Sequence, residues 1–367
     1  MTATDLDKVP GLQPPPGYVT NFDNPPNLNK WMYLTAAVCL SLSIFAVIFR
    51  LFVKARILRA MQLEELILIL SVMGLISWTG MMIKSTAWGQ GVHMWNVPES
   101  HVMHIIEFSN LIEVVYCPTI LGAKVAMLLQ IKRIFVVGKK GTLYWMHEVI
   151  LWLNIPTYLG LMLSFIFTCI PRKKIWDPSV PGHCASSSAS LIASSVLNVL
   201  SDVSMLVLPV AVIMQLQLPT KSKIVLSIIF GTSVLSIVSS VIRLVYSVLL
   251  TQTEDFTYAI MPVGLWAIAE VTSVTLSGAI PLLPGFVKFV RNGNDSSGQR
   301  SGGASHWGAG YGKNSKIQPL SSKASNSRYY PMDSETEAIV HADALKEGDA
   351  VPLGIMKTVH VQATYDG

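Results

Sequence analysis

The sequence predicts an all-α, polytopic membrane protein with seven transmembrane helices, an N-terminus outside and a disordered cytosolic tail. The chain of 367 residues is 51% hydrophobic and only 13% charged, whereas soluble domains contain about 25% charged residues. The apolar residues gather in seven runs of roughly 20 or more residues, the length at which a helix crosses about 30 Å of hydrocarbon. Basic residues collect in the connections on one side of these runs, and this bias sets the orientation.

We expect the seven spans at residues 31–53, 63–83, 102–131, 146–169, 191–216, 224–250 and 259–287. All seven are expected to be helices, because only helices and closed barrels satisfy the backbone in lipid. The runs are too long and too uniformly apolar to be barrel strands. Together they form a transmembrane domain over residues 31–290.

The segments on either side of this domain differ from it in composition. Residues 1–30 contain several prolines, asparagines and aspartates, and no apolar run follows a basic start. We therefore expect a flexible extracellular arm and no cleavable signal peptide. Residues 291–367 begin with a stretch rich in glycine, serine and asparagine, which cannot bury enough apolar surface to fold alone. This segment is expected to be a disordered cytosolic tail.

Lysine and arginine mark the connections that should face the cytosol. They occur in connections one, three and five and at the start of the tail, as Arg50, Lys54, Arg56, Arg59, Lys132, Arg133, Lys139, Lys140, Lys221, Lys223, Lys288 and Arg291. The opposite side carries Lys8, Lys30, Lys84 and one basic cluster at residues 172–174, which is outnumbered. The plasma membrane is the expected location.

Four charged residues fall inside the predicted spans at similar depth. Asp202 lies near the middle of the fifth span, and Glu113, Arg243 and Glu270 lie about 5–10 Å to its outer side. A charge at this depth is costly unless it is paired or hydrated. We expect an inward-facing cluster in which Arg243 pairs with Glu270 or Asp202. Two interpretations stay open: a binding pocket or proton-coupled switch, and a structural lock that holds the helices in register.

A second pair of charges is predicted nearer the cytosol. Lys124 in the third span and Glu65 at the start of the second have similar expected depth, and these two helices are antiparallel neighbours. An ion pair of Lys124 with Glu65, or with Glu64, would neutralise the lysine. A structural role is the favoured interpretation, because long side chains near the interface reach water easily.

The outer connections carry two motifs. Gly89, Gly91, His93 and Trp95 follow the second span; the glycines permit a tight turn, and the tryptophan suits the membrane interface. His93 could be a pH sensor or a metal ligand, although a lone histidine is more often neither. We predict no metal site.

Two cysteines, Cys169 and Cys184, bracket the long fourth connection. Both are expected on the outer, oxidising side, so a disulfide between them is predicted. Cys39 and Cys117 fall within spans and are expected to be small core residues.

The motifs that the chain lacks narrow its function. The last span contains no lysine to which retinal could attach, and no cofactor is expected. The sequence has no phosphate-binding loop, no zinc-protease motif and no serine-hydrolase elbow, so we do not expect an enzyme. No basic stripe alternates with aromatic residues, so nucleic acid is not an expected partner.

A set of short motifs is spread over residues 31 to about 290. It consists of Glu64 and Glu65, residues 89–95, residues 128–135, Cys169 to Pro171, Trp176, Cys184, Asn198, Asp202, Leu208, Pro209, Leu216, Leu218, Lys223, Gly231, Arg243, Trp266, Glu270 and Pro281. Taken jointly, these motifs resemble the fungal rhodopsin-domain family of integral membrane proteins, also described as Pth-type or satratoxin-cluster-like. The family's usual Asp-Asp at the start of the second helix is Glu-Glu here, which keeps the charge.

The resemblance implies a seven-helix protein with a cytosolic tail, either receptor-like or part of a secondary-metabolite pathway. Our first hypothesis is a receptor-like sensor of a small molecule or environmental cue, without retinal, acting with a cytosolic signalling partner. The second is a transporter or accessory membrane component for a small metabolite, although no internal repeat of the kind found in transporters is detected. A membrane-bound enzyme ranks last.

Overall fold

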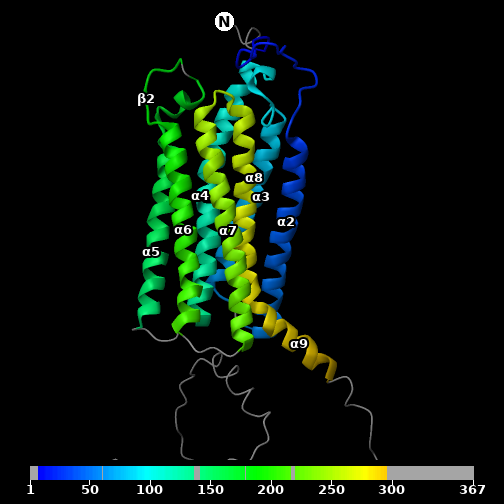
Figure 1. Ribbon diagram of the computed structural model, residues 1–367, viewed down its shortest axis with the longest axis vertical. Coiled ribbons are helices and arrows are strands. Elements are labelled where there is room, and N and C mark those ends of the chain that lie inside the picture. The colour runs from blue at the N-terminus through cyan, green and yellow to red at the C-terminus, as the bar shows by residue number, and fades with distance from the viewer. Residues whose placement is uncertain (1–6, 60, 136–140, 178, 216–219, 296–367) are drawn as a thin grey trace, which may run out of the picture. The chain divides into compact units, whose positions relative to one another are not determined.

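A computed structural model of the protein describes residues 7–59, 61–135, 141–177, 179–215 and 220–295. Seven of its helices are long and apolar enough to cross a membrane, and they form one bundle, which confirms the predicted all-α, seven-helix membrane fold (Figure 1). The expected tail lies outside the described residues from position 296 onward, as do Lys139 and Lys140 of the third connection.

The seven spanning helices are α2 (Asn29–Phe52), α3 (Leu63–Thr86), α4 (Glu99–Phe135), α5 (Thr142–Ile166), α6 (Ser187–Gln215), α7 (Thr220–Gln252) and α8 (Phe256–Ala279). Shorter elements join or extend them: η1 (Val53–Leu58), η2 (Met94–Asn96), β1 (Cys169–Ile170), η3 (Arg172–Ile175), β2 (His183–Cys184), η4 (Ile280–Leu282) and α9 (Leu283–Asp295). Each predicted span overlaps one spanning helix.

Two helix ends differ most from the prediction, by five residues or more. The last span was expected as one helix over residues 259–287, but α8 ends at Ala279 and η4 and α9 follow. Pro281 lies at the start of η4, where proline, which has no backbone N–H, interrupts the α-helical hydrogen bonds. The first helix is longer than expected, because η1 continues it to Leu58. Lys54 and Arg56, which were expected in the first connection, therefore lie in helical backbone.

The centre of the bundle is formed by α4 and α8. In their most apolar windows 56% and 61% of the residues are buried, against 22% to 39% for the other five spans. The α8 helix packs against α2, α4 and α7, and α4 packs against α3, α5 and α8. Functional groups in the interior are therefore expected on the helices that face this central pair.

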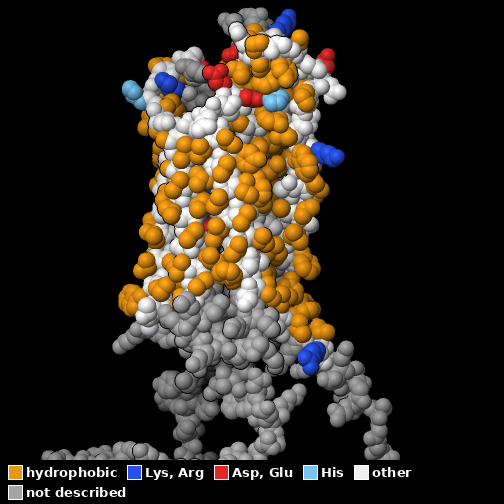
Figure 2. Space-filling model, in the orientation of Figure 1, with side chains coloured by type: hydrophobic (Ala, Val, Ile, Leu, Met, Phe, Trp, Pro, Cys, Tyr) orange, Lys and Arg blue, Asp and Glu red, His pale blue; other side chains and the backbone are white. Residues whose placement is uncertain are grey.

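The sides of the bundle are covered by hydrophobic side chains (Figure 2). Large ones such as Phe45, Trp152 and Leu200 are 60% or more exposed. An apolar surface of this extent is typical of contact with lipid rather than water. The protein is thus a multi-pass membrane protein surrounded by a bilayer.

Residues 7–28 lie against the connection between α3 and α4 at one end of the bundle, here called the cap end. Backbone hydrogen bonds join Gly11 N to Val97 O (2.9 Å), Glu99 N to Val9 O (3.0 Å) and Leu28 N to Gly91 O (3.0 Å). The segment expected to be a flexible arm thus forms specific contacts over most of its length. The other end of the bundle, where α9 begins, is called the α9 end.

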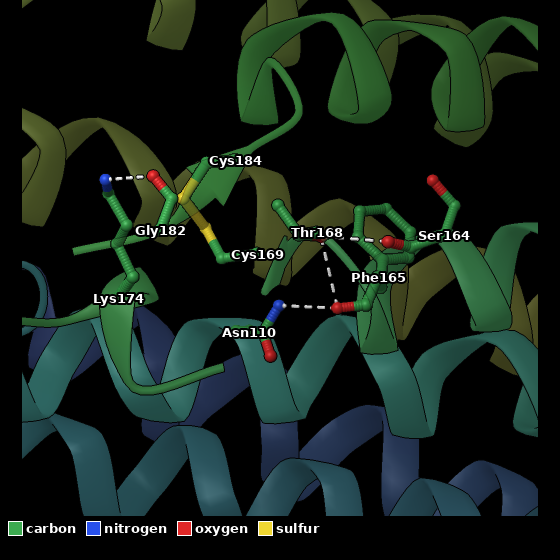
Figure 3. The surroundings of a disulfide bond; sticks show 8 residues. All are labelled: Asn110, Ser164, Phe165, Thr168, Cys169, Lys174, Gly182 and Cys184. Carbon is green, nitrogen blue, oxygen red and sulfur yellow. Dashed lines mark hydrogen bonds between the residues drawn. A yellow bond between two sulfur atoms is a disulfide. The ribbon is translucent and has the colours of Figure 1, made fainter. Parts of the chain in front are cut away.

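The predicted disulfide is present at the cap end and is confirmed (Figure 3). It joins Cys169 to Cys184 across the antiparallel pair β1 and β2. Lys174 Nζ donates a hydrogen bond to Gly182 O at 2.5 Å within the same connection. Asn110 Nδ2 of α4 donates to Phe165 O at 3.1 Å and ties α4 to the end of α5.

We predict that replacing Cys184 with serine opens this connection without unfolding the bundle. Besides the disulfide, the contacts that hold the described part of residues 170–183 are the two-residue pairing of β1 with β2 and a few hydrogen bonds and ion pairs. Limited trypsin digestion of the protein in detergent should show several-fold faster cleavage after Arg172 and Lys173, which are exposed. Cys39→Ser, which removes a free cysteine, is the control. Equal cleavage of both variants would contradict the prediction.

Candidate functional site

One face of α6 carries polar side chains into the bundle interior. Asn198, Ser201 and Asp202 are spaced three and four residues apart, so they share one side of the helix. They are 1%, 9% and 4% exposed. Burying such groups is costly unless they are paired, and each of them has a partner on another helix.

Lys124 of α4 is the partner of Asp202. Its Nζ lies 2.7 Å from Asp202 Oδ1 and donates hydrogen bonds to Tyr158 OH (2.7 Å) on α5 and to Asn198 Oδ1 (3.1 Å). It also lies 3.0 Å from Ser201 Oγ, which in turn donates to Asn154 Oδ1 at 2.5 Å. The lysine is completely buried; among the described residues its ion-pair partner is Asp202, and the other oxygens around it belong to neutral side chains.

Glu270 of α8 and Arg243 of α7 form the second ion pair of the interior. Arg243 Nε lies 3.3 Å from Glu270 Oε2. Glu270 also accepts hydrogen bonds from Tyr116 OH at 3.2 Å and from Asn198 Nδ2 at 2.5 Å. Since Asn198 Oδ1 accepts from Lys124 and Tyr158, Asn198 joins the two ion pairs into one network. We call this set, with Tyr116, Tyr158 and Ser201, the interior network.

Arg243 is the member of the interior network with the fewest hydrogen bonds. Its side chain is 2% exposed, and Nε and Nη2 have no hydrogen-bond partner among the described residues. The ion pair with Glu270 does not have hydrogen-bond geometry, and the guanidinium lies 4.7 Å from the centre of the Tyr116 ring. A buried guanidinium normally uses its five donors, so these donors are available to a bound molecule.

Arg243 lines a cavity between α3, α4, α7 and α8 that also borders the connection at the cap end. Its polar lining residues are Gln90, Ser109, Glu113, Tyr116 and Arg243. Apolar walls come from Trp78, Met82, Ile112, Ile260, Val263, Gly264 and Ala267. The free volume is about 20 Å³, which holds one or two water molecules. A larger occupant would have to displace a side chain.

Met82 is the side chain best placed to move. A Cβ added at Gly264 would lie 2.2 Å from Met82 Cε, so the glycine provides the space that the methionine fills. Methionine is unbranched and repacks easily. Rotation of Met82 would therefore enlarge the cavity.

The structure brings together the four charges of the predicted cluster, with one change of partner. Arg243 pairs with Glu270, one of the two partners considered, and Asp202 pairs with Lys124 instead. Glu113 lines the same cavity as Arg243. Among the described residues its carboxylate makes no hydrogen bond or ion pair.

The predicted pair of Glu65 or Glu64 with Lys124 is wrong. Glu65 and Glu64 at the start of α3 lie 3.2 and 3.4 Å from Arg50 Nη2 of α2, and Lys54 Nζ of η1 is 2.9 Å from Glu64. Lys124 is on the neighbouring helix, but its side chain points toward α5 and α6 rather than α3. Arg50 and Lys54 were counted among the basic residues of the first connection rather than among the interior charges, so their pairing with Glu64 and Glu65 was not predicted.

Arg50 also links α2 to the central helices at the α9 end. Its Nη1 donates to Gly278 O of α8 at 2.7 Å and to Gln130 Oε1 of α4. With Lys54, Glu64 and Glu65 it forms a buried group in which two positive charges meet two negative ones. We call it the Arg50 cluster.

The outer-loop motif forms a stacked cluster at the cap end. Gly89 and Gly91 have φ angles of +106° and +88°, values that glycine adopts without strain. His93 Nδ1 lies 2.5 Å from Asp255 Oδ2, and its ring stacks on Trp95 (centroids 4.3 Å apart). This arrangement ties the α3–α4 connection to the start of α8. No group of three or more potential metal ligands of the His, Cys, Asp or Glu type occurs within the described ranges.

Several members of the interior network were not predicted. The depth of Lys124 was counted from the middle of the expected span, but α4 begins at Glu99 and extends beyond the end of α5, as the Asn110–Phe165 contact shows. This offset brings Lys124 level with Asp202. The i, i+3, i+4 spacing of Asn198, Ser201 and Asp202 places these three side chains on one face of the helix. This spacing was the sequence signal that could have added Asn198 and Ser201 to the predicted cluster.

Comparison with known proteins agrees with this architecture. A family model described as "Fungal rhodopsin domain" matches residues 28–288. The "SAT4 family membrane protein" of Emericella nidulans is 31% identical over 206 residues, which cover 56% of this chain and 52% of that protein. The chain thus spans about half the length of that relative. No solved structure matches the chain.

Two relatives carry names that refer to biosynthesis clusters. "Fugralins biosynthesis cluster protein 2" of Gibberella zeae is 28% identical over 372 residues, covering 97% of this chain and 87% of that protein. "Wortmanamides biosynthesis cluster protein C" of Talaromyces wortmannii is 28% identical over 124 residues, covering 34% of this chain and 33% of that protein.

Proposed function

The chain belongs to the fungal rhodopsin domain family, and we propose that it is a receptor-like, non-enzymatic member that binds a small molecule in the cavity beside Arg243, without retinal. The observation that carries this proposal is the guanidinium of Arg243, which is buried in the cavity wall while Nε and Nη2 lack hydrogen-bond partners among the described residues. A ligand with carbonyl or hydroxyl oxygens would supply the missing acceptors, and the walls around it are mainly apolar.

The interior network offers a route by which binding could change the bundle. Arg243 contacts Glu270, Glu270 accepts a hydrogen bond from Asn198, and Asn198 accepts one from Lys124. An acceptor placed against Arg243 would compete with Glu270 for the guanidinium. The hydrogen bonds that join α4, α6, α7 and α8 would then change in strength, because neighbouring hydrogen bonds in a network affect one another. A difference in ligand affinity between two such arrangements is what a receptor requires.

The proposal includes an orientation and a location. The excess of lysine and arginine in the connections at the α9 end supports a cytosolic position for that end. The cap end, with its disulfide, would then face the outside of the plasma membrane. A cytosolic signalling partner would contact the α9 end.

The test is thermal stability of the purified protein in detergent against small lactones, ketones, carboxylic acids and amines. A ligand at ten times its Kd should raise the Tm of the wild type by about 3 °C. The rise should be lost in Arg243→Gln and persist in Asp202→Asn, which alters the network outside the cavity lining. If Arg243→Gln does not fold, Ser109→Ala tests the same cavity. A ligand that stabilises wild type and both cavity variants equally would contradict the site.

A second candidate function is transport, or an accessory role, for a small metabolite. It is favoured by the two relatives whose names refer to biosynthesis clusters. A transporter carries its substrate across the bilayer, whereas a receptor only binds it. Flux of a stabilising compound into vesicles that contain the protein would therefore identify a transporter, and binding without flux would identify a receptor.

A further inference from the structure

The charges of the interior network and Glu113, taken together, do not balance. Among the described residues, this set contains the cations Lys124 and Arg243 and the carboxylates Glu113, Asp202 and Glu270, which gives two positive charges against three negative ones; only Glu113 and Arg243 line the cavity itself. Lys124 pairs with Asp202 at 2.7 Å and Arg243 with Glu270 at 3.3 Å. Glu113 is left without an ion-pair partner.

An unmatched carboxylate in a bundle interior is costly. The Arg50 cluster shows the usual arrangement in this protein, because its two cations and two carboxylates compensate each other. Glu113 differs in that it lines a cavity. The missing charge can therefore be supplied by something that occupies the cavity.

Two further oxygen atoms in the cavity wall lack hydrogen-bond donors. Gln90 is 0% exposed, and its Oε1 has no partner within the part of the chain that the structure describes. Ser109 Oγ is also buried and without a partner there. Ser109 lies four residues before Glu113 on α4, so both side chains are on one face of the helix. Three side chains thus present oxygen atoms to one small volume.

We propose that this cavity binds one monovalent alkali cation through Glu113, Gln90 Oε1 and Ser109 Oγ. Oxygen ligands suit hard cations, and a free volume of about 20 Å³ has room for an ion with a water molecule. One added positive charge gives three positive and three negative charges, whereas a divalent ion would reverse the imbalance and an anion would increase it. The charge of Arg243 repels the ion only weakly, because Glu270 neutralises that charge. The proposal shares the cavity with the proposed function but does not depend on it.

The test measures Tm of the purified wild type in sodium, potassium and choline chloride at equal ionic strength, with no organic ligand present. Choline is too large for the cavity and controls for screening. Sodium at ten times its Kd should raise Tm by about 3 °C over choline, and the potassium arm shows which ion is preferred. Glu113→Gln should lose the rise and should be more stable than wild type in choline, because it removes the unmatched charge.

The control for this test is Glu107→Gln, which removes a carboxylate from the same helix where its side chain is 43% exposed. That variant should keep the full sodium effect, and Ser109→Ala should reduce it. Equal wild-type Tm in all three salts, or an undiminished sodium effect in Glu113→Gln, would overturn the proposal. Because the organic ligand panel can be run in choline chloride alone, a negative sodium result leaves the receptor proposal separately testable.

Discussion

Asp202→Ala is expected to lower the free energy of unfolding by about 3–5 kcal/mol, the cost of leaving a buried charge without its partner. Lys124 would remain in the centre of the bundle at 0% exposure. Tyr158, Asn198 and Ser201 would solvate its ammonium group, but none of them carries a compensating charge. Unfolding by SDS titration in mixed micelles measures the change.

A matched double variant separates the lost charge pair from lost packing. Lys124→Met with Asp202→Leu removes both charges, and replacing a buried pair by apolar side chains is often close to neutral. We expect the double variant to be more stable than Asp202→Ala, although Asn198 and Tyr158 lose a partner. The pair Lys173–Asp177, whose side chains are 65% and 26% exposed, provides the surface control, and Asp177→Ala should change stability little. A double variant no more stable than Asp202→Ala would refute the pairing.

Arg50→Met is expected to produce a loss of similar size, about 3–5 kcal/mol. Among the described residues, the change leaves Lys54 as the one cation that pairs with Glu64 and Glu65. It also removes the donor to Gly278 O and Gln130 Oε1, which ties α2 to α8 and α4. Both the charge balance and the contacts between helices at the α9 end would therefore fail together.

Arg56→Met removes the same charge from an exposed position in η1 and is the control. Arg50→Lys keeps the charge but offers a single donor group in place of a planar fork, so its stability should be intermediate. Indistinguishable thermal unfolding of Arg50→Met and Arg56→Met would show that the Arg50 cluster does not stabilise the bundle.

The number of spanning helices followed from the sequence because apolar length is a direct requirement of the bilayer. Each predicted span overlaps a helix. The predicted and observed spans differ at the helix ends, because apolar content does not indicate at which residue a helix begins or ends. Pro281 ends α8 although the apolar run continues beyond it. Likewise η1 extends the first helix through Lys54 and Arg56, residues whose charge suggested a loop.

Pairing of the interior charges was harder to predict than their presence. Arg243 and Glu270 lie on consecutive antiparallel helices at similar depth, and helical rise alone placed them together. The pairing of Lys124 with Asp202 depends on how far α4 extends past its neighbours. The sequence of one span does not indicate this offset between helices. The choice between Lys124 and Arg50 for Glu65 depends on helix rotation, which an almost uniformly apolar helix such as α3 does not show in its sequence.

The Arg50 cluster and the Lys124–Asp202 pair differ in the order in which synthesis delivers their charges to the membrane. Glu65 follows Arg50 by 15 residues and Glu64 follows Lys54 by 10, so the first helical hairpin enters the bilayer already neutralised. Lys124 is translated 74 residues before Asn198 and 77 before Ser201. Two more helices must be synthesised before the charge of Lys124 is compensated. During synthesis, Lys124 therefore stays without its compensating charge until the fifth helix has been made.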